Sequence, residues 1–185
     1  MAPGTPLGRV RILFFFRVVF ISSFEGRGAR KAAPSLIGWT GKVLAEHPDE
    51  LRKLTGDRTL VPNAIEELLR FESPSPVQAR YVTREVEHYG HVAPAGSAIL
   101  LLNGCGNRDD RKFADGDRFD VTRKIDHHLA FGYGLHFCLG TGLEGRVALD
   151  EVLQRFPSWE VNWDNARQPR TSTVRRWERL PVRTP

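Results

Sequence analysis

Cysteine is scarce in this sequence of 185 residues, because Cys105 and Cys138 are the only two. Small secreted proteins that rely on disulfides carry several cysteine pairs at regular spacings. Two cysteines cannot build such a framework, so the sequence excludes a disulfide-rich secreted domain. The cysteine content is typical of a protein from a reducing compartment, and we predict a cytoplasmic location.

A long hydrophobic run is also missing. The most apolar stretch, residues 11–21, is interrupted by Arg17, whereas a helix that spans a bilayer needs roughly 20 apolar residues. The stretch has neither the unbroken apolar core nor the small-residue cleavage site of a signal peptide. We therefore expect no transmembrane span. We interpret residues 11–21 as a core helix or strand without its packing partners, with an interfacial anchor as the alternative.

Acidic residues are rare at the C-terminal end of the chain. Residues 166–185 contain six arginines and one glutamate, which accounts for the whole net charge of +5. No aromatic stacking platform or nucleic-acid-binding module accompanies these arginines, so we interpret them as a solvated basic tail and expect no nucleic-acid partner. The overall composition, with 41% hydrophobic and 26% charged residues, is ordinary for a globular protein.

The spacing of apolar residues predicts a mainly α protein with small β-sheets, an α+β fold. The predicted helices cover residues 34–46, 48–54 and 62–72, and a last segment that ends near 156. Pro34 suits the first turn of the first helix. The predicted strands cover residues 77–82, 86–89 and 98–102, and a terminal pair at 159–163 and 174–182. Residues 103–130 are too polar and irregular for a regular element.

The most informative segment is Phe-Gly-Tyr-Gly-Leu-His-Phe-Cys-Leu-Gly at residues 131–140. Its three glycines alternate with bulky residues around Cys138, so the backbone can pass close to a large flat group and present a sulfur atom to it. A thiolate ligand for haem iron is the natural interpretation. The alternative is an ordinary tight loop whose cysteine acts as a small buried hydrophobic residue.

These residues resemble the haem-binding signature of the cytochrome P-450 family, Phe-x-x-Gly-x-(Arg/His)-x-Cys-x-Gly. Every position of the signature is filled here, by Phe131, Gly134, His136, Cys138 and Gly140. The resemblance implies that Cys138 is the thiolate ligand of the iron in haem b and that His136 faces a haem propionate. An imidazole that donates a hydrogen bond also suits a carboxylate partner on chemical grounds.

The same resemblance implies further contacts with the cofactor. Phe131, Gly132 and Gly140 are expected to line the haem beside the thiolate. Arg80, in the first predicted strand, is expected to point at a haem propionate. An exposed strand arginine without a ligand is the alternative for Arg80.

Glu67 and Arg70 lie three residues apart and therefore on one face of the predicted helix 62–72. Such a spacing alone is typical of a weak surface ion pair. The family has a Glu-x-x-Arg pair at this place in the chain. The resemblance therefore implies that Glu67 and Arg70 are structural and tie the helix to the meander, the irregular segment 103–130 before the cysteine.

The resemblance covers residues 34–185, which we predict to form the C-terminal haem-binding region of the family fold, whereas residues 1–33 form an atypical N-terminal segment. The family's proton-delivery segment, with an acid and a threonine, would fall at residues 28–33, which read Gly-Ala-Arg-Lys-Ala-Ala here. After Gly140 the sequence is about three residues shorter than the family pattern, which would rotate the following helix face by roughly 60°.

The resemblance also implies an activity. Members of the family are haem-thiolate monooxygenases that insert one oxygen atom into an organic substrate, with electrons from a ferredoxin-like partner or a reductase. We therefore expect the full-length parent to act on a small lipophilic molecule. The helices that cover the distal haem face are missing from this sequence, so the alternative is a truncated haem-binding fragment without turnover.

Overall fold

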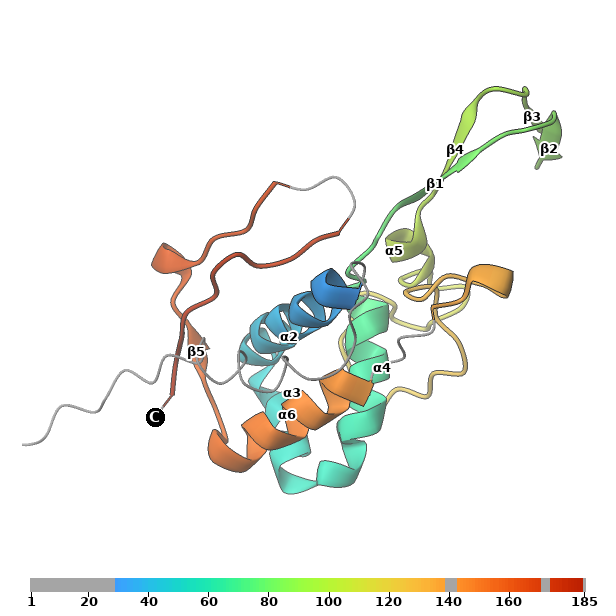
Figure 1. Ribbon diagram of the computed structural model, residues 1–185. Coiled ribbons are helices and arrows are strands. Elements are labelled where there is room, and N and C mark those ends of the chain that lie inside the picture. Colours follow the sequence, from blue (N-terminus) through green and yellow to red (C-terminus); the bar gives the residue numbers. More distant parts are fainter. Residues whose placement is uncertain (1–28, 139–142, 171–173, 185) are drawn as a thin grey trace, which may run out of the picture.

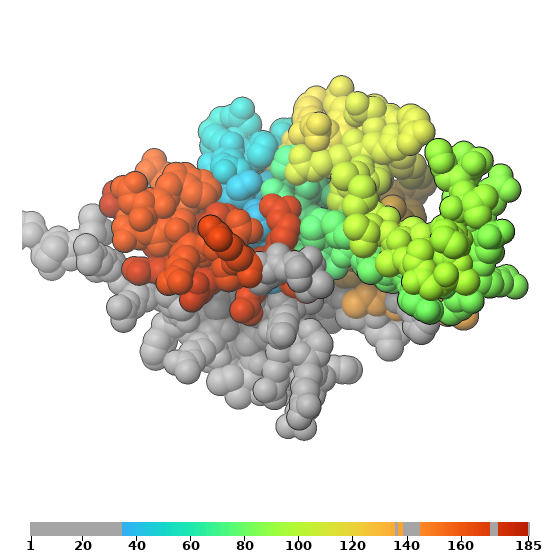
Figure 2. Space-filling view, turned by 90° about the horizontal axis from the view of Figure 1, so that it is seen from above, coloured from blue at the N-terminus to red at the C-terminus, as the bar shows by residue number. Residues whose placement is uncertain are grey.

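The computed structural model describes residues 29–138, 143–170 and 174–184. They form a helical body that carries a β arm on one side and a C-terminal segment on the other (Figure 1). The body contains the helices α2 (Ala29–Glu46), α3 (Pro48–Gly56), α4 (Val61–Phe71) and α6 (Leu143–Arg155). Seen from above in Figure 2, the arm in green and the C-terminal segment in orange and red lie at opposite ends.

The hydrophobic core lies between these helices. On α4, the residues Ala64, Ile65 and Leu68 are completely buried, and their spacing places them on one stripe of the helix. The buried apolar residues of the core are Leu36, Val43, Leu44, Leu51, Leu54, Val61, Ala64, Ile65, Leu68, Leu69, Phe119, Val121, Leu149, Leu153 and Trp159. Because Phe119 and Val121 belong to the meander, the irregular segment packs on the same core as the helices.

A glycine allows α6 to approach α2 closely. A Cβ atom at Gly145 would lie 2.6 Å from Leu36 Cδ2, which is closer than carbon atoms pack in protein interiors. A larger side chain would therefore push the two helices apart. The contact therefore fixes the first turn of α6 against α2.

Most predicted helices are confirmed, with small differences at their ends. α3 and α4 begin and end within two residues of the predicted 48–54 and 62–72, and α6 ends at Arg155. The predicted start of α2 is wrong, because the helix begins at Ala29 and not at Pro34. Residues 29–33 read Ala-Arg-Lys-Ala-Ala, and such strong helix formers offset the hydrogen bond that an interior proline removes.

The β arm consists of two antiparallel pairs. β1 (Gln78–Tyr81) pairs with β4 (Ala98–Leu101), and β2 (Val86–His88) pairs with β3 (His91–Ala93) at the far end of the arm (Figure 1). These pairs confirm the strands predicted near 77–82, 86–89 and 98–102. The sequence did not predict β3.

The turn between β2 and β3 explains why the second hairpin strand was missed. Tyr89 and Gly90 connect the strands, and both have positive φ values, of 51° and 76°. Positive φ at both central residues is the geometry of a type I′ turn, for which Asn-Gly is the usual sequence. With tyrosine in the first position, the turn has no recognisable signature.

The terminal β pair is confirmed only in part, because the first strand lies inside the predicted 159–163 but the second overlaps the predicted 174–182 only at Val182. β5 (Glu160–Val161) pairs with β6 (Val182–Arg183), and an isolated bridge joins Arg167 to Arg179. The meander contains one short helix, α5 (Asn103–Gly106), that the sequence did not predict. Single 3₁₀ turns are η1 (Arg58–Leu60), η2 (Gly134–His136) and η3 (Trp163–Asn165).

Helices combined with small two-stranded sheets agree with the predicted α+β class. In the described part of the chain, none of the helices has the length and apolar character needed to cross a membrane. The predictions for residues 11–21, Gly28 and Gly140 concern positions outside the described residues.

Candidate functional site

Residues 131–138 form a loop, the cysteine loop, that is closed by hydrogen bonds of its own backbone. The Cys138 N–H donates to the Phe131 carbonyl oxygen at 3.0 Å, and the Phe137 N–H donates to the Gly134 carbonyl oxygen at 3.0 Å. Gly132 and Gly134 have φ values of 75° and 79°, a backbone conformation that residues with a Cβ adopt only under strain. Glycine at these two positions therefore lets the chain fold back so that Cys138 stands at the end of the loop.

The outer surface of this loop is apolar and open. The Leu135 side chain is fully exposed, and Tyr133 and Phe137 are also exposed. A Cβ atom at Gly132 or Gly134 would meet no atom within 4 Å. The Cys138 thiol is exposed as well, and no disulfide joins it to Cys105. Bare backbone, apolar side chains and a sulfur atom thus share one accessible loop.

Contacts between aromatic rings pack the cysteine loop against the preceding segment. The half-buried ring of Phe131 lies 6.0 Å from the ring of Phe137 and 5.5 Å from the ring of His128. Such separations are typical of favourable aromatic pairs. The loop is therefore packed onto the segment that precedes it.

Glu67 and Arg70 form a buried ion pair on α4, with 0% of either side chain exposed. Arg70 Nε and Nη2 donate to the two Glu67 carboxylate oxygens at 2.7 and 2.8 Å. The pair also reaches the meander, where Arg70 donates to the carbonyl oxygens of Asn107, Gly116 and Arg118, and Glu67 accepts from Asp120 N–H and Arg123 Nε. A buried ion pair needs such additional hydrogen bonds to offset the loss of hydration.

Asn107 is a connecting residue; the segment Asn107-Arg108-Asp109 resembles the family in sequence, but the sequence assigned no role to Asn107. It is completely buried. Its side-chain oxygen accepts from the Leu129 N–H at 2.6 Å, its amide nitrogen donates to Ser73 Oγ at 2.7 Å, and its carbonyl oxygen accepts from Arg70 at 2.7 Å. Asn107 thus joins the end of α4 to the segment that leads into the cysteine loop.

Replacing Asn107 with alanine is expected to lower the free energy of unfolding by about 1–3 kcal/mol, because the half-buried Leu129 N–H loses its acceptor and the buried Ser73 hydroxyl loses its donor. The measurement is urea unfolding followed by circular dichroism. Asn165→Ala is the matched control, since the Asn165 side chain is exposed and its loss is expected to change stability by less than about 0.5 kcal/mol. Equal midpoints for the two variants would contradict the role given to Asn107.

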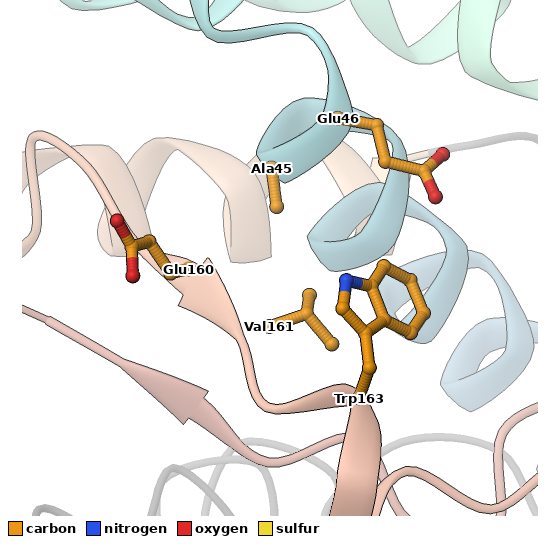
Figure 3. A pocket seen from close by; sticks show the side chains of 5 residues that line it. All are labelled: Ala45, Glu46, Glu160, Val161 and Trp163. Atoms are coloured by element: carbon orange, nitrogen blue, oxygen red, sulfur yellow. The ribbon is translucent and has the colours of Figure 1, made fainter.

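A shallow pocket lies away from the cysteine loop, between the end of α2 and β5 (Figure 3). Its volume is about 280 Å³, and it is lined by Ala45, Glu46, Glu160, Val161 and Trp163. The Glu46 carboxylate is paired with Lys42 at 3.0 Å. The lining residues include no cysteine and no glycine, so the pocket lacks the thiol and the bare backbone that the cysteine loop presents.

The family model for cytochrome P-450 matches residues 45–177 of this chain. The chain belongs to the cytochrome P-450 family. One relative is 6-deoxyerythronolide B hydroxylase of Saccharopolyspora erythraea, which is 40% identical over 171 residues, or 90% of this chain and 41% of the relative. The biotin biosynthesis cytochrome P-450 of Bacillus subtilis is 38% identical over 151 residues, 80% of this chain and 38% of the relative. The chain thus spans about two fifths of the length of these curated relatives.

Solved cytochrome P-450 structures share the fold of the described residues. One is a cytochrome P-450 in complex with an acyl carrier protein that carries hexadec-9Z-enoic acid, with a TM-score of 0.80 and 35% identity over 85% of this chain and 42% of that chain. Another is a hydroxylase of himastatin biosynthesis, with a TM-score of 0.79 and 38% identity over 84% of this chain and 43% of that chain.

Membership of the cytochrome P-450 family implies haem, and the residues of the cysteine loop fit such a group. A haem is a flat, largely apolar ring that needs close backbone approach on one face and a ligand for its iron. Gly132 and Gly134 leave open space at their Cβ positions, and Leu135 and Phe137 expose apolar surface beside the Cys138 thiol.

Arg80 and His136 are the two residues predicted to bind the haem propionates. Arg80 is exposed on β1, and in the described residues its guanidinium bonds only locally, to the Ala79 carbonyl oxygen at 3.0 Å and Gln78 Oε1 at 3.2 Å. His136 lies in η2. The structure therefore brings Phe131, Gly132 and Cys138 together, whereas the printed partners of the Arg80 guanidinium, Gln78 and Ala79, both lie on β1.

Proposed function

We propose that Cys138 is the thiolate ligand of a haem b iron, and that residues 34–185 are the haem-binding region of a cytoplasmic cytochrome P-450 monooxygenase. The observation that carries the proposal is the loop geometry: a backbone hydrogen bond from Cys138 to Phe131 closes a loop whose exposed surface is glycine backbone, apolar side chains and one thiol. The complete signature around Cys138 supports the same assignment.

Each residue of the loop has a distinct proposed role. Phe131, Gly132 and Gly140 line the haem, with the two glycines allowing the backbone to approach it. Arg80 and His136 donate hydrogen bonds to the propionates when the cofactor is present. A bound haem with a thiolate ligand supplies the electron density that favours cleavage of the O–O bond.

The proposed reaction of the full-length parent is insertion of one oxygen atom into a small lipophilic substrate. Two electrons are required for each turnover, and a ferredoxin-like protein or a reductase is proposed as their source. Relatives of this chain include a hydroxylase and a biosynthetic enzyme, which supports an oxidative reaction without identifying the substrate.

Replacing Cys138 with serine is expected to abolish the thiolate-type Soret band of the reduced carbon monoxide complex, because a serine hydroxyl stays protonated and is a poor ligand for haem iron. The measurement is the carbon monoxide difference spectrum of the purified chain reconstituted with haem. Cys105→Ser is the matched control, since Cys105 is also an exposed thiol but lies on α5. A thiolate band that persists in Cys138→Ser, or disappears in Cys105→Ser, would contradict the assignment.

A second candidate function is a haem-binding fragment without turnover. The observation that favours it is the exposed apolar surface of the described residues: Tyr81, Leu100 and Leu102 on or beside the β1–β4 pair, and Leu135 on the cysteine loop. The altered sequence at residues 28–33, where the family has its proton-delivery acid and threonine, supports the same alternative. The ratio of organic product formed to NAD(P)H consumed distinguishes the two candidate functions.

A further inference from the structure

One carboxylate on α4 binds both chain segments that flank the cysteine loop. Glu66 Oε2 lies 3.1 Å from His128 Nε2, and Glu66 Oε1 accepts from Arg146 Nη2 at 2.7 Å. His128 precedes the cysteine loop, and Arg146 lies in the first turn of α6 after it. Glu66 is the residue next to Glu67, but its contacts are separate from those of the buried Glu67–Arg70 pair.

The hydrogen bonds of His128 define how Glu66 is connected to the loop. The Ala130 N–H donates to His128 Nδ1 at 3.2 Å, so we assign the ring proton to Nε2, which donates to Glu66. The His128 side chain is only 5% exposed, and its ring lies 5.5 Å from Phe131. His128 therefore contacts Glu66 on one side and the Phe131 ring of the cysteine loop on the other.

The second flank is connected through Arg146. Its ion pair with Glu66 is partly shielded, with side-chain exposures of 41% for Arg146 and 30% for Glu66. The hydrogen bond from His128, together with the one from Arg146, lowers the pKa of the Glu66 carboxyl despite its burial. The carboxylate is thus ionised at neutral pH and able to hold both partners.

We infer that Glu66 is a positioning residue for Cys138, which sets the place of the thiol relative to α4 by holding both flanks of the loop. The inference rests on the proposed role of Cys138 as a ligand. His128 lies ten residues before Cys138 in the chain, and Arg146 lies eight residues after it. With one flank released, the loop keeps its internal hydrogen bonds but loses its fixed position.

The test compares Glu66→Gln with Asp150→Asn in the full 185-residue chain. Asp150 is a matched control, because it pairs α6 with Arg58 at a similar exposure, 43% and 33%, and its side-chain partners among the described residues, Arg58 and Gln154, lie outside the cysteine loop. Without haem, Glu66→Gln is expected to reduce hydrogen-exchange protection of residues 128–138 by about tenfold, as expected for the loss of a charge-assisted hydrogen bond. Asp150→Asn is expected to leave that protection unchanged.

The second measurement is made on chains reconstituted with haem. At equal haem content, Glu66→Gln is expected to show a smaller fraction of the thiolate-type carbon monoxide complex than Asp150→Asn. A purely structural contribution would lower the melting temperature and the haem content without changing that fraction. If Glu66→Gln does not fold, Arg146→Gln removes one flank at a half-exposed side chain and is expected to produce the same two changes at smaller size.

Unchanged protection of residues 128–138 in both Glu66→Gln and Arg146→Gln would overturn the inference, as would thiolate fractions equal to that of Asp150→Asn. Failure of the proposed function gives a different result. If the unmodified chain forms no thiolate complex, Cys138 is not the ligand, and hydrogen exchange still decides whether Glu66 positions the loop.

Discussion

Glu67→Ala is expected to lower the free energy of unfolding by about 3–5 kcal/mol, because it leaves a buried arginine without its counter-ion. Arg70 is completely buried, and its remaining partners are three backbone carbonyl groups. The substitution also removes the acceptor of the Asp120 N–H. The measurement is urea unfolding followed by circular dichroism, together with the amount of haem retained after gel filtration.

Glu151→Ala provides the comparison for Glu67→Ala. Glu151 pairs with Arg155 on the same kind of helical spacing, but both side chains are more than two fifths exposed. Such exposed pairs contribute about 0–1 kcal/mol. If the two variants unfold at the same urea concentration and retain equal haem, the proposed structural role of the Glu67–Arg70 pair is wrong.

The second large effect concerns the use of electrons. The 185-residue chain, loaded with haem, is expected to release hydrogen peroxide and not an oxygenated product when it receives electrons from a ferredoxin system and NAD(P)H. Coupled turnover needs a site that excludes water. The Cys138 loop exposes its thiol and its apolar residues, and the chain spans about two fifths of its curated relatives.

The experiment measures cofactor consumed, peroxide released and organic product formed for a panel of lipophilic substrates. A full-length relative, such as 6-deoxyerythronolide B hydroxylase with its own substrate, serves as the positive control for electron delivery. Product equal to cofactor consumption for any substrate would refute the expectation. It would also favour the monooxygenase over the non-catalytic fragment as the function of this chain.

Several elements were predictable because their signals are local. The helix α4 has buried residues at helical spacing and a proline in its first turn, so the helix 62–72 was predicted to within one residue at each end. The strands β1 and β4 are short extended runs between turn residues. The type I′ turn at Tyr89 and Gly90 was missed, because its usual sequence signature is absent.

The candidate site was predictable only in part. The signature around Cys138 identified the loop, since glycine at positive φ is a local backbone requirement that the sequence displays directly. The sequence assigned no role to Asn107 or to Glu66. Each becomes informative only when a partner distant in sequence, Leu129 for Asn107 and His128 with Arg146 for Glu66, is placed beside it.

The sequence by itself determined the family resemblance, the cysteine that we propose as ligand and most of the helices, because these depend on residue types at fixed short spacings. The resemblance implied that Glu67 and Arg70 tie α4 to the meander, but only the tertiary structure decided that the pair is fully buried and which meander groups it binds. Their spacing is the same in a surface pair and in a buried one. The difference arises from desolvation by residues 37 to 56 positions away in the chain, which no local pattern records.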